Sequence, residues 1–145
     1  MKLLVLLLVT LVALFGVVLA TKEDDYLAYK NAEKAADSKK AACSKYAAGS
    51  CGTIAECDTC ATCLTEVTSL YKTAVAMRRE YTRKWFAGVS DPGHTAWERG
   101  LTSANNSRVQ MANKCKGTKK ILVAKEKREA AKSPTVARRA SVGSA

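Results

Sequence analysis

Apolar residues recur every three or four positions between Thr53 and Gly88, which is the spacing of one face of an α-helix. Thr53 followed by Glu56 has the pattern of a capping box at a helix start, and a glycine such as Gly88 is a common helix end. Arg78 is the one polar interruption of the main seam, whose other members are Cys57, Cys60, Leu64, Val67, Tyr71, Ala74, Tyr81 and Trp85. The pattern predicts one long helix, and apolar neighbours beside the seam make its face wide enough to pack against two partners.

A helix is also predicted before this stretch. Asp24 or Asp25 is suited to cap it, and it is expected to run to about Ala48 and to stop at Gly49. The residues of its inner face are mostly alanines, which permit close approach but bury little apolar area. This helix is therefore expected to need a covalent staple.

A third helix is predicted to begin with a capping box formed by Thr95 and Glu98 and to end at about Lys132. The connections at 49–52 and 88–95 are short and rich in turn residues, so consecutive helices should be antiparallel neighbours. No alternating pattern typical of strands is present. The fold predicted from the sequence is all-α, an antiparallel three-helix bundle.

Residues 1–20 are predicted to be a secretory signal peptide. Lys2 leads into the apolar run 3–19, and small residues precede the cleavage point. An uncleaved anchor is the alternative, because this run is near the lower length limit for crossing a bilayer. Cleavage would leave a helical domain at 21–132 and a small, polar and basic tail at 133–145, which we expect to be disordered.

All six cysteines lie after the predicted signal peptide. An even number in a secreted chain indicates a disulfide framework, because the secretory route is oxidising. Turn centres near residues 51 and 91 allow the facing positions of antiparallel helices to be estimated, and an error of one helical turn would exchange neighbouring cysteines. The predicted pairs are Cys63 with Cys115, Cys43 with Cys60, and Cys51 with Cys57.

The spacing of Cys57, Cys60 and Cys63 also fits a metal or iron–sulfur site. No histidine lies near this run, and ferredoxin-like clusters need a fourth thiolate at a suitable distance, so disulfides are preferred and neither metal nor cofactor is expected. The single histidine, His94, would need Asp91 beside it for catalysis, and no hydrolase or phosphate-binding motif is present. An enzyme is not predicted.

Three further features concern polar and aromatic residues of the predicted helices. Arg78 and Arg108 interrupt the seams of neighbouring helices. They should therefore reach Glu80, Glu66 or solvent, or mark an anion site between the helices. Trp85 and Trp97 flank the second turn and should pack at the end of the bundle rather than form a ligand cage. Asn105 begins an N-glycosylation sequon and is expected to be exposed.

Charge adds a candidate binding region. The chain has 24 Lys and Arg against 13 Asp and Glu, and removal of Lys2 with the signal peptide lowers the formal net charge from +11 to +10. Ten basic residues lie between positions 114 and 139, against two glutamates. Such a density attracts sulfated glycans or phospholipid head groups, although a charged helix end that serves only solubility is the alternative. The predicted anion-binding residues are Lys114, Lys116, Lys119, Lys120, Lys125, Lys127, Arg128 and Lys132.

These features favour a secreted, extracellular, basic binding protein that acts at anionic surfaces, as host-defence, toxin-like or matrix-binding proteins do. Aromatic residues are absent after Trp97, so no stacking platform for single-stranded nucleic acid is expected. An extracellular helical signalling ligand for a receptor is the alternative. A small-ligand carrier is disfavoured, because the alanine-rich first helix is expected to leave little room for a cavity.

Overall fold

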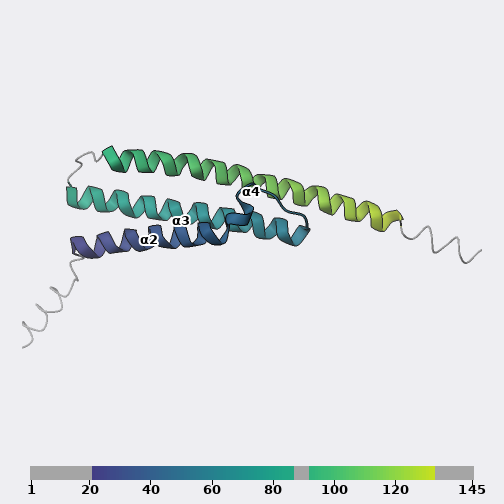
Figure 1. Cartoon of the computed structure of the whole chain (residues 1–145), viewed down its shortest axis with the longest axis horizontal. Coiled ribbons are helices and arrows are strands. Elements are labelled where there is room, and N and C mark those ends of the chain that lie inside the picture. Colours follow the sequence, from purple (N-terminus) through teal and green to yellow (C-terminus); the bar gives the residue numbers. More distant parts are fainter. Residues whose placement is uncertain (1–20, 87–91, 133–145) are drawn as a thin grey trace, which may run out of the picture.

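A computed structural model describes residues 21–86 and 92–132. Within these ranges the chain forms three long helices, α2 (Lys22–Ala42), α3 (Ile54–Phe86) and α4 (Pro92–Lys132), with a short 3₁₀ turn, η1 (Ser44–Tyr46). Figure 1 shows α2 and α4 on opposite sides of α3, each running antiparallel to it. The all-α prediction is confirmed for this part of the chain, whereas the predicted signal peptide and tail lie outside the described residues.

The helices form an open arrangement around α3. This helix packs against both neighbours, but no Cα atom of α2 lies within 8 Å of a Cα atom of α4 in the described ranges. The seam predicted for α3 is buried from Cys57 to Ala74, while Tyr81 and Trp85 are only half-buried. The expectation that α3 serves two partners is therefore confirmed.

The first helix begins and ends earlier than predicted. Thr21 is its N-cap: the Asp24 amide donates to Thr21 Oγ1 at 3.2 Å, and the Thr21 amide donates to Asp24 Oδ2 at 3.0 Å. Asp24 thus occupies the third helical position of a capping box rather than the cap. The helix ends at Ala42, not Ala48, because η1 turns the chain and brings Tyr46 into the core at 4% exposure. Alanines are frequent both before and after Ala42, so the sequence pattern does not indicate that the helix ends there.

The start of α3 follows the prediction closely. The Glu56 amide donates to Thr53 Oγ1 at 3.1 Å, and the Glu56 carboxylate accepts from the Gly52 amide at 2.9 Å, one residue farther back than in a standard capping box. The start of α4 does not follow it, since the helix begins at Pro92 rather than at Thr95. Proline suits a first helical position because its missing N–H would have no partner there.

Three disulfides cross-link the chain, and two of the predicted pairs are wrong. Cys51–Cys57 is confirmed, but Cys43 pairs with Cys63 and Cys60 pairs with Cys115. The first corrected pair is centred on residue 53 rather than 51, and the second between residues 87 and 88 rather than 91. The position that faces a given residue on the neighbouring helix moves by two residues for each residue of error in the turn centre. These small shifts therefore exchange Cys60 and Cys63, which lie one helical turn apart.

Disulfide mapping of the oxidised protein is expected to recover this connectivity. Only Ala61 and Thr62 separate Cys60 from Cys63, so neither trypsin nor a glutamate-specific protease cuts between them. Partial reduction, differential alkylation and electron-transfer fragmentation should link Cys43 to Cys63 and Cys60 to Cys115. Recovery of Cys43–Cys60 instead would show that α2 sits about one helical turn out of the register described above.

Candidate anion-binding site

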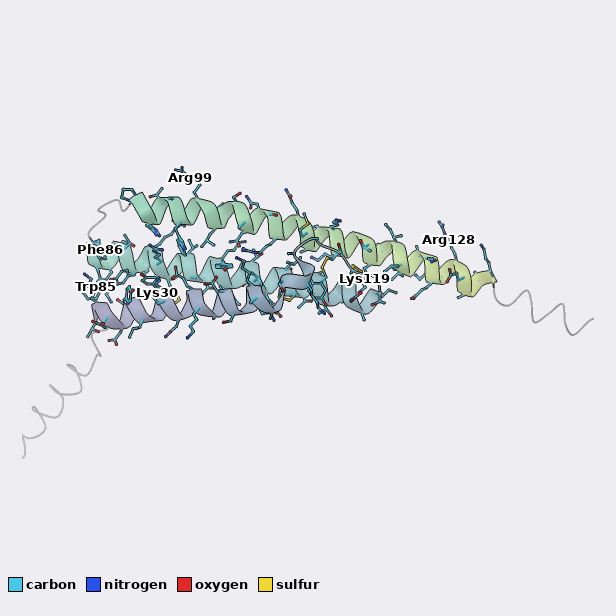
Figure 2. All side chains as sticks on the ribbon, in the orientation of Figure 1. Lys30, Trp85, Phe86, Arg99, Lys119 and Arg128 are labelled. Carbon is cyan, nitrogen blue, oxygen red and sulfur yellow. A yellow bond between two sulfur atoms is a disulfide. The ribbon has the colours of Figure 1, made fainter. Side chains whose placement is uncertain are left out.

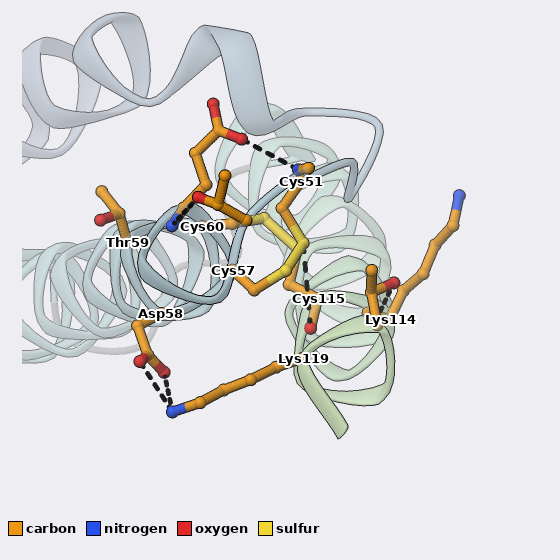
Figure 3. The surroundings of a disulfide bond; sticks show 12 residues. Cys51, Cys57, Asp58, Thr59, Cys60, Lys114, Cys115 and Lys119 are labelled. Carbon is orange, nitrogen blue, oxygen red and sulfur yellow. Dashed lines mark hydrogen bonds and ion pairs between the residues drawn. A yellow bond between two sulfur atoms is a disulfide. The ribbon is translucent and has the colours of Figure 1, made fainter. Parts of the chain in front are cut away.

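The C-terminal part of α4 projects beyond the beginning of α3 (Figure 1). Near that point Lys119 Nζ contacts both carboxylate oxygens of Asp58 at 2.7 Å, as Figure 3 shows. The segment that follows, residues 120–132, is here called the α4 extension, and its length is about 20 Å at the helical rise per residue. It is largely exposed, and Ile121 reaches 71% exposure. This extension is the part of α4 that presents its side chains most openly.

The α4 extension carries five basic residues against Glu126 and Glu129. Lys120, Lys127 and Arg128 are exposed and make no hydrogen bond or ion pair with any other described residue. Figure 2 shows Arg128 on the projecting part of the helix. The ion pair between Lys125 and Glu129 is long, at 4.0 Å, and exposed, so it neutralises little charge. The extension therefore keeps a net positive charge that the rest of the chain does not offset.

Some of the predicted anion-binding residues contact other parts of the fold, and others are exposed. Lys114 donates to the Ala48 carbonyl at 3.2 Å and Lys119 pairs with Asp58, so both tie α4 to the rest of the fold. Lys116 is exposed beside α3. Helical geometry places Lys116 and Lys127 on one side of α4, Lys125 and Lys132 on nearly the opposite side, and Arg128 between them. The positive charge thus surrounds much of the extension rather than forming a single face.

Several basic residues in the rest of the fold are paired with carboxylates. Lys84 and the Trp85 indole hydrogen-bond to Asp25 at 2.6 and 2.7 Å, and these contacts hold the pKa of Asp25 below its usual value. The helix interfaces carry further ion pairs: Lys39–Glu66 at 2.5 Å, Arg78–Glu33 at 3.6 Å, and Arg79–Glu98. These pairs tie the helices together and neutralise part of the positive charge of the three-helix region, whereas exposed cations such as Lys34, Lys72 and Arg99 have no carboxylate partner there.

Comparison with models of protein families, curated proteins and solved structures finds no match to this chain. The functional argument therefore depends on the residues themselves. Within residues 21–86 and 92–132, no helix combines the length and hydrophobicity needed to cross a membrane. Three disulfides with no free cysteine indicate an oxidising environment.

Arg78 lies between the rings of Tyr29 and Trp97, with its guanidinium carbon 5.7 and 4.4 Å from their centroids. Its carboxylate partner is Glu33 of α2, rather than the glutamates expected from the sequence. Since an acidic side chain already faces this guanidinium, the interpretation of Arg78 as an anion site has no support. The contacts instead connect all three helices at one layer.

Arg108 makes a different set of contacts. Its guanidinium carbon lies 4.6 Å from the centroid of Tyr71, and its Nη1 donates to Asn105 Oδ1 at 2.6 Å. The Tyr71 hydroxyl donates in turn to the Asp37 carboxylate of α2. Burial and this hydrogen bond raise the pKa of Tyr71 to about 12, so its hydroxyl remains a donor at neutral pH. Arg108 itself has no carboxylate partner among the described residues.

Asn105 is buried at 7% exposure, so the expectation of an exposed glycosylation sequon is wrong. Leu101, Asn105 and Arg108 are spaced by four and three residues, which places Asn105 on the side of α4 that faces α3. A glycan on this nitrogen would be incompatible with the packing described here.

The structure shows the contacts of the cysteine run and of the histidine. Cys57, Cys60 and Cys63 each belong to a different disulfide, so none supplies a thiolate for a metal. His94 lies in the first turn of α4 with Nε2 3.4 Å from Glu98, and its ring lies against Trp97. Asp91, the acid considered with it, lies outside the described residues.

Proposed function

We propose that this chain is a secreted basic helical protein that binds anionic surfaces through the α4 extension, as host-defence, toxin-like or matrix-binding proteins do. The observation that carries the proposal is the set of exposed cations, Lys120, Lys127 and Arg128, which have no ion-pair partner among the described residues and lie on a helical segment that projects from the fold. In this proposal residues 1–20 are the signal peptide, and the disulfides support passage through an oxidising compartment.

A sulfated glycan suits the extension better than a phospholipid bilayer. Membrane-surface helices combine a basic face with a broad apolar face that enters the lipid. The extension has only Ile121, Leu122 and Val123 as larger apolar residues, and its charges lie on two sides of the helix. A flexible polyanion can contact both sides, whereas a flat membrane contacts only one.

Substituting Lys120, Lys127 and Arg128 together by glutamine is expected to weaken binding to immobilised heparin by about a hundredfold. Each basic residue near an anionic surface contributes roughly 1 kcal/mol, and the three together give about 3 kcal/mol. Surface plasmon resonance at low salt measures this change. Binding of the unmodified protein should collapse at several-hundred-millimolar salt, because exposed charges are then screened.

The matched control replaces Lys34, Lys72 and Arg99 by glutamine, which removes the same charge from exposed positions on α2, α3 and the start of α4. This variant should retain most of the affinity for heparin. Equal losses in the two variants would show that net charge, and not the α4 extension, controls binding. Binding to cells that persists at high salt and in both variants would favour the alternative, a signalling ligand with a receptor interface that has an apolar centre.

A further inference from the structure

A groove with a volume of about 400 Å³ lies between α2 and α4. Its floor is formed by Leu64 and Val67 of α3, and Met111 of α4 contributes to one wall. On the other wall are Ala41 of α2 and Ala47, which follows η1. The size is within the range typical of sites for small molecules, and the groove is separate from the α4 extension.

The small residues of the first helix create this space. The two outer helices flank α3 without close contact between their backbones, and two of the residues in the wall facing α4, Ala41 and Ala47, have only methyl side chains. The alanine-rich sequence was expected to leave little room for a cavity, and that expectation is wrong. Short side chains would close the space only if the outer helices approached one another, and α3 holds them apart.

Contacts at both ends bound the groove. At one end Gly49 lies directly against the backbone of Met111, and Lys114 donates to the Ala48 carbonyl. Toward the other end, Tyr71 spans from its hydrogen bond with Asp37 on α2 to the guanidinium of Arg108 on α4. The groove is therefore a short, defined site rather than a continuous channel along the helices.

The rim carries a net positive charge. Lys40 and Arg108 line the groove, and neither has a carboxylate partner in the described part of the chain. Asp37 also lines it, but its carboxylate already accepts the Tyr71 hydroxyl. Arg108 uses one N–H toward Asn105, so further donors of its guanidinium remain for a ligand. An anionic amphiphile has a negatively charged head group, which the two cations can bind, and a hydrocarbon chain, which the apolar floor can contact.

We propose that this groove binds a single-chain anionic amphiphile of medium length, with its hydrocarbon chain over Leu64 and Val67 and its carboxylate at Arg108 and Lys40. The probe for a first test is decanoate, with decyltrimethylammonium as the cationic counterpart of equal chain length. Titration calorimetry on the disulfide-bonded chain should give one saturable site for decanoate. The cationic probe should bind about tenfold more weakly, because it meets the same apolar floor but two like charges.

Groove-filling variants locate the site. Ala41→Phe should weaken decanoate binding by about tenfold or more, since the ring occupies the space of the hydrocarbon chain. Ala42→Phe is the matched control, because Ala42 is exposed on the same helix but does not line the groove, and it should bind decanoate normally. Arg108→Gln should reduce the affinity for decanoate about fivefold and reduce the preference for decanoate over the cation. Thermal unfolding of each variant establishes that it remains folded.

The glutamine triple variant of the α4 extension separates this inference from the proposed function. It should lose heparin binding and keep decanoate binding. Unchanged decanoate binding by Ala41→Phe, loss of decanoate binding with the α4 extension variant, or the absence of a saturable site in the unmodified protein would each overturn the assignment of the groove.

Discussion

Replacing Cys60 and Cys115 together by alanine is expected to lower the free energy of unfolding by about 4 kcal/mol, since a cross-link between residues this far apart strongly restricts the unfolded chain. The two residues are separated by 55 positions, and both are completely buried. Their bridge is the disulfide that joins α3 to α4, and it lies in the same apolar cluster as Tyr46 and Leu64. Its loss removes the covalent link that holds the longest helix, α4, in register.

Guanidinium unfolding of the oxidised proteins, followed by circular dichroism, measures this loss. The matched control is the Cys51→Ala and Cys57→Ala double variant, which removes a bridge across only six positions. Its loss should be about 2 kcal/mol, because the closed loop is much shorter. Equal losses for the two double variants would contradict the argument from loop length and would indicate that local packing dominates both bridges.

Gly49→Ala is expected to destabilise the protein by about 3 kcal/mol, from backbone strain and overpacking together. Gly49 has φ of 65°, a conformation that residues with a Cβ rarely adopt. A Cβ at this position would lie 2.9 Å from the Met111 carbonyl oxygen and 3.2 Å from the Met111 Cα and Cβ. These atoms belong to or adjoin the backbone of a packed helix, so they cannot move aside without shifting α4.

Thermal and denaturant unfolding of Gly49→Ala should show this loss, and Gly52→Ala provides the comparison. An added Cβ at Gly52 would meet only the flexible Glu56 carboxylate, at 3.4 Å, and its φ is not positive. We therefore expect a change of less than about 1 kcal/mol at Gly52. A Gly49→Ala variant as stable as the unmodified protein would show that the connection between α2 and α3 does not approach α4 as closely as described.

Local patterns predicted the helices well. The apolar spacing in α3 anticipated its buried face, and the end of α4 was expected at about Lys132, where the helix ends. Helix starts were less accurate: Thr21 and Pro92 begin helices that were assigned to start slightly later. Both residues are recognised starting signals, but competing signals such as Asp25 and the pair of Thr95 with Glu98 lie within one turn.

The candidate binding regions were harder to predict than the helices, because they depend on contacts between residues far apart in the sequence. The sequence identified a dense run of basic residues, but it could not show that Lys114 and Lys119 are engaged with Ala48 and Asp58 while Lys120, Lys127 and Arg128 are not. The groove was missed because its walls come from α2 and α4, which are far apart in sequence and do not pack on each other. A sequence pattern within one helix cannot indicate a space between two helices that a third helix holds apart.

The sequence by itself determined that this chain forms antiparallel helices, which face of α3 is buried, and where the positive charge accumulates, because each of these depends on residues within a few turns of one another. The tertiary structure decided which of Cys60 and Cys63 meets Cys115, why Asn105 is buried, and which cations keep their charge unmatched. These outcomes depend on the register between helices. Since an error of one residue in a turn centre moves the facing position by two, a displacement too small to change any local pattern is enough to exchange the partners.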